Sequence, residues 1–140
     1  MLNKAFELAK TAHTGQVDKS GKPYILHPIT VAGMVDTEEE KIVALLHDVV
    51  EDTLVTLEEL RHQGFSETIV AAVDVLTKRP GVDYADYIHQ VKQNSLALTV
   101  KIADMTHNMD LSRIPNPTDK DYARIEKYKR ALPELKIEKG

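Results

Sequence analysis

Apolar residues recur at steps of three and four along most of the chain, which is the period of a helix that buries one face. No segment shows the strict alternation of apolar and polar residues that is typical of a half-buried strand, and no internal repeat is present. We therefore expect an all-α protein. The predicted helices, given with any capping residue, cover residues 2–12, 28–35, 37–52, 56–64, 66–76, 83–91, 94–111 and 118–132.

The predicted helix ends rest on residues that cap or begin helices. Thr37 and Glu40 form a capping-box pair at the start of the third helix. Pro28 suits the first position of the second helix because its φ is fixed near the helical value, which places His27 at the N-terminus of that helix. Residues 16–26 lack a sustained period and are expected to form a loop.

Composition favours one domain and limits the chemistry of any metal site. A chain of 140 residues with 42% hydrophobic residues can bury one core, so we predict a single domain over residues 1–140, with a frayed tail at 133–140. The chain has no cysteine, which excludes disulfides, thiolate ligands and a cysteine nucleophile. A metal ion must therefore be held by imidazole, carboxylate or amide groups.

Charge and hydropathy exclude two classes of partner. The net charge of −4 indicates no broad basic face for a nucleic acid. No segment approaches the roughly 18 consecutive apolar residues of a membrane span, and the N-terminus lacks the apolar core of a signal peptide. We expect a soluble, cytoplasmic protein that binds neither nucleic acid nor membrane, and the sequence leaves its oligomeric state open.

Two ionisable residues interrupt the most apolar stretch of the chain. His47 and Asp48 lie between two pairs of apolar residues, and burying such groups without partners is costly. Glu51 and Asp52 follow one helical turn later, so the four residues form two neighbouring polar columns on one predicted helix. A divalent cation would compensate these charges. An internal salt bridge, or a helix end that is open to water, would also do so.

A second predicted helix repeats this pattern. Asp104 and Asn108 lie one turn apart among apolar neighbours. His27 adds a third element, because a helix N-terminus favours a neutral imidazole, the form that binds metals. Two histidines and two aspartates give nitrogen and oxygen donors that suit Mn²⁺, with Fe²⁺, Zn²⁺ or Mg²⁺ as alternatives. We predict a metal site of His27, His47, Asp48 and Asp104 that leaves positions open for water and substrate oxygens.

The chain resembles the HD superfamily, and more narrowly the hydrolase domain of the Rel/Spo alarmone enzymes and the stand-alone small alarmone hydrolases. Three segments carry the resemblance, and they occur in the same order over nearly the whole chain. They are AHTGQVDKSGKPYILHPITVA, ALLHDVVEDT and VKIADMTHNMDL. The combination of KSGKPYILHP with LLHDVVEDT is far more specific than an isolated His-Asp dipeptide.

The resemblance implies an HD-domain helical bundle in which the four predicted ligands hold one Mn²⁺. It implies hydrolysis of the 3′-pyrophosphate from guanosine tetra- or pentaphosphate, (p)ppGpp, to give GDP or GTP and pyrophosphate. The residues that match the family's catalytic groups are Glu51 and Asp52, as an acid pair, and Asn108, as an amide that holds water or phosphate. The residues that match substrate-binding positions are Lys19, Ser20, Arg124 and Tyr128.

Two residues depart from the family pattern. Asp18 stands where many members have an arginine that packs on the guanine base. Asp110 stands where the family's His-Asn pair is usually followed by a hydrophobic residue and then an arginine. A guanidinium stacks on a purine and an aspartate does not, so an adenine alarmone or NADPH is an alternative substrate. A metal-bound sensor that binds a nucleotide without turning it over is a third reading, which the retained acid pair and amide argue against.

Other polar residues carry weaker signals. Additional candidates for neutralising substrate phosphates are Lys78, Arg79 and Lys101, although each of these is expected more often to be solvated. We do not expect His13, His62, His89 or His107 to be metal ligands. We expect His13 to lie beside the site or to cap the first helix, and His107 to face away from the site. Tyr24 is expected to pack its loop onto the bundle.

Overall fold

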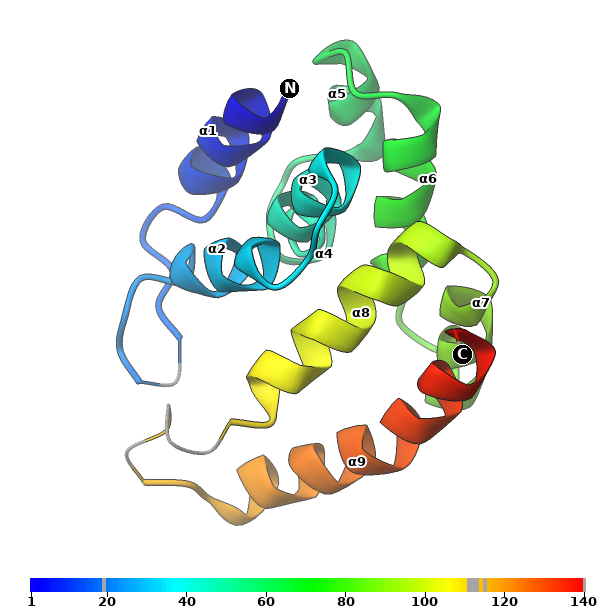
Figure 1. Cartoon of the computed structure of the whole chain (residues 1–140). Coiled ribbons are helices and arrows are strands. Elements are labelled where there is room, and N and C mark those ends of the chain that lie inside the picture. The colour runs from blue at the N-terminus through cyan, green and yellow to red at the C-terminus, as the bar shows by residue number, and fades with distance from the viewer. Residues whose placement is uncertain (19, 111–113, 115, 140) are drawn as a thin grey trace.

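The computed structural model describes residues 1–18, 20–110, 114 and 116–139, without the side chains of 137–139. In this part of the chain the regular structure is helical, and one isolated bridge joins Val17 to Pro23. The all-α prediction is therefore confirmed (Figure 1). The helices are α1 (Leu2–Ala12), α2 (Leu26–Gly33), α3 (Glu38–Leu46), α4 (Val49–Asp52), α5 (Leu57–His62), α6 (Glu67–Leu76), α7 (Tyr84–Lys92), α8 (Ser95–Asn108) and α9 (Asp119–Lys139).

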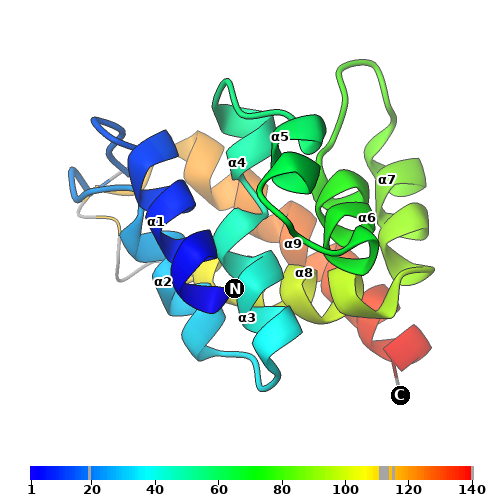
Figure 2. The same ribbon diagram turned by 90° about the horizontal axis from the view of Figure 1, so that it is seen from above.

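Two helices, α3 and α8, lie at the centre of the bundle. Helix α3 packs against α1, α2, α6 and α8, and α8 also packs against α2, α6, α7 and α9. Figure 1 shows α8 crossing between the α2–α3 pair and α9, and Figure 2 shows the same helices from above. Fully or almost fully buried residues of this core include Ala5, Val31, Ile42, Val43, Leu46, Val70, Val73, Val91, Val100 and Met105.

Several helices begin where the capping signals predict. The Thr37 hydroxyl accepts a hydrogen bond from the Glu40 N–H at 3.1 Å, and the Glu40 carboxylate accepts one from the Thr37 N–H at 2.9 Å. The side chains of Thr56, Ser66 and Asn94 each accept a hydrogen bond from the backbone N–H three residues later. These local bonds satisfy N–H groups that have no partner within the helix, which is why they fix the starting points.

The structure corrects two predicted boundaries near the polar residues. Helix α2 begins at Leu26 rather than at Pro28, so His27 lies inside its first turn. The predicted continuous helix over 37–52 is wrong, because α3 ends at Leu46 and the single turn of α4 begins at Val49. His47 and Asp48 form the turn between these helices. Of the predicted helix 94–111, α8 ends at Asn108 and residue 111 lies outside the described residues.

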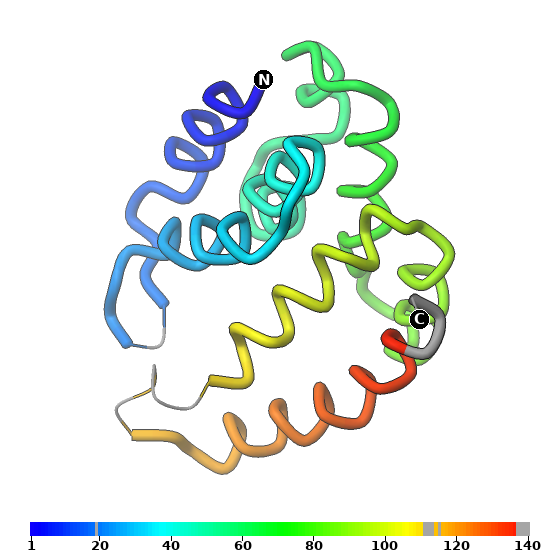
Figure 3. The backbone as a smooth tube through the Cα atoms, viewed as in Figure 1, coloured from blue at the N-terminus to red at the C-terminus, as the bar shows by residue number. Residues whose placement is uncertain are grey.

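The C-terminal segment is helical as far as Lys139, within the range for which the sequence predicts a frayed tail. Helix α9 continues through Pro133 to Lys139, where the proline removes one backbone hydrogen bond without ending the helix. The reason is tertiary, because Leu135 is fully buried and α9 packs on α7 and α8. Figure 3 shows the backbone tube of α9 following α8 before it reaches the C-terminus. Burial of this apolar side chain outweighs the local breaking signal.

The described helices include none that combines the length and the apolar composition needed to cross a membrane.

Leu135→Ala should therefore lower the free energy of unfolding by about 2–5 kcal/mol, since it removes a fully buried side chain from the core. Urea unfolding followed by circular dichroism measures this change. Tyr122→Ala is the control on the same helix, because Tyr122 is half-exposed and its loss should cost much less. Equal effects of the two substitutions would mean that the end of α9 does not pack on the core.

Candidate metal centre and active site

Three elements bring the four predicted metal ligands together. His27 comes from the first turn of α2, His47 and Asp48 come from the turn between α3 and α4, and Asp104 comes from α8. His27, His47 and Asp104 are all buried, with 3%, 4% and 6% of their surface exposed. Because α2, α3 and α8 pack against one another, packing of the core brings these side chains together.

The cluster converges on one carboxylate oxygen and one imidazole nitrogen. Oδ1 of Asp104 lies 2.8 Å from Nε2 of His27 and 3.3 Å from Nε2 of His47. Nε2 of His47 also lies 3.1 Å from Oδ2 of Asp48. Each predicted ligand therefore faces another predicted ligand. The four side chains that the sequence predicts as metal ligands therefore lie together in the structure.

The break between α3 and α4 orients the central pair. Nδ1–H of His47 donates to the Ala44 carbonyl oxygen, one turn back on α3, and this bond directs Nε2 into the cluster. The Tyr24 hydroxyl donates to Oδ2 of Asp48. Burial and the nearby Asp48 carboxylate raise the pKa of Tyr24, so this hydroxyl keeps its proton. A continuous helix would not have provided the turn in which His47 and Asp48 lie.

The donor atoms fit a divalent cation. One ligand atom from each of His27, His47 and Asp104 lies within 4.8 Å of the other two. Ligands that bind an ion at about 2.0–2.2 Å and at right angles to each other are about 3 Å apart, which is close to the spacing found here. Asp48 extends the set from beside His47. Two imidazoles with carboxylates are a typical donor set for Mn²⁺, Fe²⁺ or Zn²⁺.

A buried lysine balances part of the negative charge. Nζ of Lys101 lies 3.3 Å from Oδ2 of Asp104, one turn away on α8, and 5.3 Å from the centre of the Tyr87 ring. Burial alone would raise the pKa of Asp104, but Lys101 and His47 together hold it well below 3.8. The expectation of a solvated Lys101 is therefore wrong, because this ammonium group is a partner of the predicted ligand Asp104.

The predicted acid pair lies at the solvent edge of the cluster. Oε1 of Glu51 accepts a hydrogen bond from the backbone N–H of Lys78 at 3.1 Å. Burial and the Asp48 carboxylate raise the pKa of Glu51 above 4.5 and that of Asp52 above 3.8. Acids with raised pKa values exchange protons more readily near neutral pH than ordinary surface carboxylates do. Glu51 and Asp52 thus have the electrostatic setting of proton-transfer groups.

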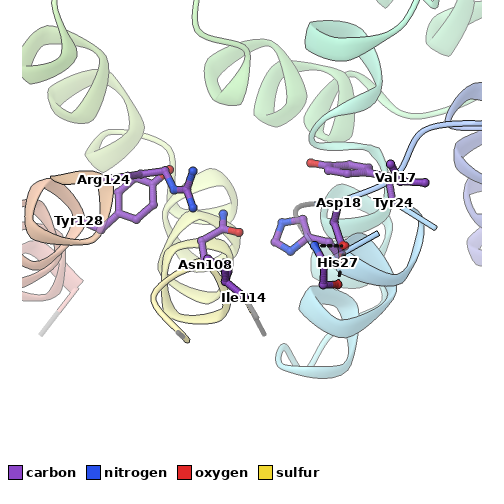
Figure 4. A pocket seen from close by; sticks show the side chains of 9 residues that line it. Val17, Asp18, Tyr24, His27, Asn108, Ile114, Arg124 and Tyr128 are labelled. Carbon is purple, nitrogen blue, oxygen red and sulfur yellow. Dashed lines mark hydrogen bonds between the residues drawn. The ribbon is translucent and has the colours of Figure 1, made fainter. Parts of the chain in front are cut away.

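The third predicted catalytic residue contacts a predicted metal ligand directly. Nδ2 of Asn108 donates to Oδ1 of Asp104 at 3.1 Å, across one turn of α8. Asn108 also lines a pocket of about 390 Å³ beside His27. In Figure 4, Arg124 and Tyr128 of α9 face His27 and Tyr24 across this pocket, with Asn108 between them. The amide therefore lies between the cluster and a space that is large enough for a small molecule.

The predicted substrate-binding residues mostly line the same pocket. Ser20, Arg124 and Tyr128 form part of its wall, whereas Lys19 lies outside the described residues. The Arg124 guanidinium donates to Oδ1 of the buried Asp121 at 3.3 Å, which anchors it on α9. Of the weaker candidates, Arg79 forms an ion pair with Asp74 at 2.6 Å, which indicates a local structural role.

Asp18 folds its own loop. Its Oδ1 accepts hydrogen bonds from the N–H of Ser20 at 2.8 Å, from the Ser20 hydroxyl at 2.6 Å and from the N–H of Lys22 at 3.1 Å. This turn is closed by Gly21, whose φ of +84° suits a residue without a side chain. The loop is thus held in shape by a carboxylate at the position where the family pattern has an arginine.

Sequence reasoning missed residues that contact the cluster. His107, expected to face away, has its Nδ1 at 2.7 Å from Nδ1 of His27, and the planes of the two rings differ by 11°. Tyr24 bonds Asp48 directly rather than only packing its loop. His13 is buried beside Tyr24, as predicted, and its ring centre lies 4.9 Å from that of Tyr24. Helical spacing offered one signal, because residue 107 is one turn beyond Asp104.

The family of the chain follows from a comparison with known protein families. The family model described as "HD domain" matches residues 5–127, which is most of the chain. The chain belongs to the HD domain family. Members of this family bind divalent metal ions, and the His–Asp cluster described above is where this HD domain has the donors for one. The predicted fold is thereby confirmed.

Curated relatives are longer proteins that contain a similar segment. A GTP pyrophosphokinase of Myxococcus xanthus is 34% identical over 127 residues, which cover 78% of this chain and 17% of that protein. The bifunctional (p)ppGpp synthase/hydrolase SpoT of Escherichia coli is 33% identical, covering 77% and 17%. A guanosine-3′,5′-bis(diphosphate) 3′-pyrophosphohydrolase of Haemophilus influenzae is 35% identical, covering 73% and 17%. The chain thus spans about a sixth of their length.

A solved structure has the same fold. It belongs to a metazoan ortholog of SpoT, described as hydrolysing ppGpp and playing a role in starvation responses. The TM-score is 0.76 at 22% sequence identity, and the match covers 96% of this chain and 84% of that one. Such a likeness shows that nearly the whole chain shares the fold of that protein.

Asp104→Asn should destabilise the metal-free protein by about 3–5 kcal/mol, because it leaves the Lys101 ammonium buried without its anionic partner. The double variant Lys101→Met/Asp104→Asn removes both charges and should recover much of this loss. Urea unfolding of the four proteins in the cycle measures the coupling. As a control, Asp74→Asn breaks the exposed ion pair with Arg79 and should cost at most about 1 kcal/mol. Additive effects at 101 and 104 would contradict the pairing.

The metal-free protein should also lose stability as the pH rises above neutrality. Burial alone lowers the pKa of His47, but Asp48 and Asp104 outweigh it and hold the pKa well above 6.5. The protonated imidazole therefore stabilises the fold fully below about pH 6.5, and this contribution disappears as the pH rises through the folded-state pKa. The free energy of unfolding, measured by urea from about pH 6.5 to pH 9.5, should fall.

His47→Gln should flatten this pH dependence, whereas His62→Gln, at an exposed position, should preserve it. A wild-type free energy of unfolding that is constant over the same range would contradict the raised pKa of His47. Because a metal ion binds the neutral imidazole, added Mn²⁺ should stabilise the protein more strongly at the alkaline end of the range.

Proposed function

We propose that the chain is a metal-dependent phosphohydrolase that removes the 3′-pyrophosphate from a (p)ppGpp-type alarmone, giving GDP or GTP and pyrophosphate. One observation carries this proposal: a buried His–Asp cluster with the donors for a divalent ion adjoins a nucleotide-sized pocket and a pair of acids with raised pKa values. The names of the Escherichia coli and Haemophilus influenzae relatives support the same substrate class.

We propose His27, His47, Asp48 and Asp104 as the metal ligands and Mn²⁺ as the ion. When bound, the ion lowers the pKa of a coordinated water and polarises a phosphoryl oxygen. Within this proposal, the hydrogen bonds to His47 and Asp48 keep the donor atoms directed into the site before any ion arrives. Such fixed donors reduce the rearrangement that binding requires.

Glu51 and Asp52 are proposed to orient the attacking water and to accept its proton. Their raised pKa values have the same two causes, burial and the Asp48 carboxylate. An acceptor whose pKa is closer to neutrality returns the proton to the leaving group more easily than an ordinary carboxylate does. Asn108 is proposed to hold a phosphate or water oxygen at the mouth of the cluster, since its amide lies between Asp104 and the pocket.

The pocket wall supplies groups for the rest of a nucleotide. We propose that the Arg124 guanidinium neutralises phosphate charge, because a fixed cation suits phosphate oxygens. Ser20 and Tyr128 add a hydroxyl and a ring to the same wall. The Asp18 carboxylate is engaged in its own loop, and this residue cannot stack on a base as a guanidinium does. An adenine alarmone and NADPH therefore belong in the assay beside ppGpp.

The deciding experiment is an Mn²⁺-dependent assay of pyrophosphate release from ppGpp and pppApp and of phosphate release from NADPH. Glu51→Gln should lower the turnover rate by about 10²–10⁴-fold without changing Mn²⁺ affinity substantially, because it removes a proton acceptor and no ligand. Glu39→Gln is the matched control at an exposed position on α3 and should leave the rate unchanged. Binding of the nucleotides by wild type without any product would refute the hydrolase proposal and support a sensor.

A further inference from the structure

The two histidines of the cluster differ in what contacts their outer nitrogen. Nδ1–H of His47 donates to the Ala44 carbonyl oxygen, which is a fixed acceptor in the helix backbone. Nδ1 of His27 faces a side chain instead, with Nδ1 of His107 at 2.7 Å. The two rings are nearly parallel at 11°, and their centres are 4.9 Å apart. A second imidazole therefore occupies the position that a carbonyl occupies for His47.

The tautomer of His27 depends on this contact. If Nε2 of His27 gives its lone pair to a metal ion, the proton of the neutral ring must be on Nδ1. Two nitrogens at 2.7 Å share one proton, so the facing Nδ1 of His107 must then be the acceptor. The proton of His107 is consequently on its Nε2. The geometry allows this arrangement without moving either ring.

We propose that His107 is a positioning residue that accepts the Nδ1–H bond of His27 and so presents Nε2 of His27 to the metal. This inference rests on the proposed metal site. Outer partners of metal-binding histidines fix the tautomer and the ring orientation, and their loss typically weakens metal binding about 10–100-fold. None of the roles assigned to Glu51, Asp52 or Asn108 includes this contact.

Helix α8 makes the contact possible through its period. Asp104, His107 and Asn108 are spaced i, i+3 and i+4, so all three lie on the face that α8 turns toward α2. Asp104 meets Nε2 of His27 from this face, and His107 meets Nδ1 of the same ring. One helix therefore contacts both nitrogens of one imidazole, and the position of α8 fixes the rotation of that ring.

Two substitutions separate the hydrogen bond from the ring packing. His107→Phe keeps an aromatic ring beside His27 but removes the acceptor. His107→Asn removes the ring but places an amide oxygen where Nδ1 was, because the first side-chain bonds of asparagine follow those of histidine. If the hydrogen bond matters, phenylalanine should be the harmful substitution. If packing of the ring matters, asparagine should be the harmful one.

The test is titration of the metal-free full chain with Mn²⁺ in a calorimeter. We expect His107→Phe to bind about 10–100-fold more weakly than wild type, and His107→Asn to bind close to wild type. His89→Phe is the control, since His89 is exposed on α7, forms a hydrogen bond with Gln93 and lies outside the cluster. Circular dichroism and the metal-free unfolding midpoint show whether each variant folds.

A second readout needs no variant. In the Zn²⁺-loaded wild type, ¹⁵N NMR of the imidazoles should find His27 protonated at Nδ1 and His107 protonated at Nε2. The opposite tautomer for His107 would overturn the inference, as would Mn²⁺ affinity that is unchanged in His107→Phe or equally reduced in both variants. Wild type that binds neither ion would instead refute the metal site itself, which distinguishes the two failures.

Discussion

The site depends on the interactions of one buried carboxylate, that of Asp104. Its Oδ1 meets His27, His47 and Asn108, and its Oδ2 meets the Lys101 ammonium. A carboxylate that is removed from water needs such partners, because its desolvation alone would be strongly unfavourable. Those partners come from α2, from the turn after α3 and from α8 itself, so satisfying one charge fixes the relative positions of the central helices.

The same electrostatic arrangement gives two nearby carboxyl groups, those of Asp104 and Glu51, pKa values that are shifted in opposite directions. Burial favours the neutral form in both, but the cations around Asp104 reverse this effect and keep it ionised. Glu51 has weaker compensation beside the negative Asp48, and its pKa is raised. Sites that combine an always-ionised acid with one that exchanges protons are suited to hydrolysis, because the first holds charge and the second moves a proton. The fold thus places both kinds of acid, one that stays ionised and one that can exchange a proton, in and beside one cluster.

Local signals explain the parts of the fold that were predictable. The capping hydrogen bonds of Thr37, Thr56, Ser66 and Asn94 form between residues three positions apart. Such local bonds can be predicted from the sequence alone. Local sequence signals failed to predict a helix boundary where tertiary packing outweighed them. Pro133 lies inside α9, since burial of Leu135 stabilises the helix on both sides of it.

The sequence by itself determined the helical fold class and the residues with unusual chemistry, because a charged residue inside an apolar run is visible without coordinates. Only the tertiary structure decided how they meet. It placed the break after Leu46 that orients His47, paired Lys101 with Asp104, and set His107 against His27, 80 positions apart. Contacts between distant segments depend on how helices pack, and the helical period gives only the face of each residue, not the partner that this face meets.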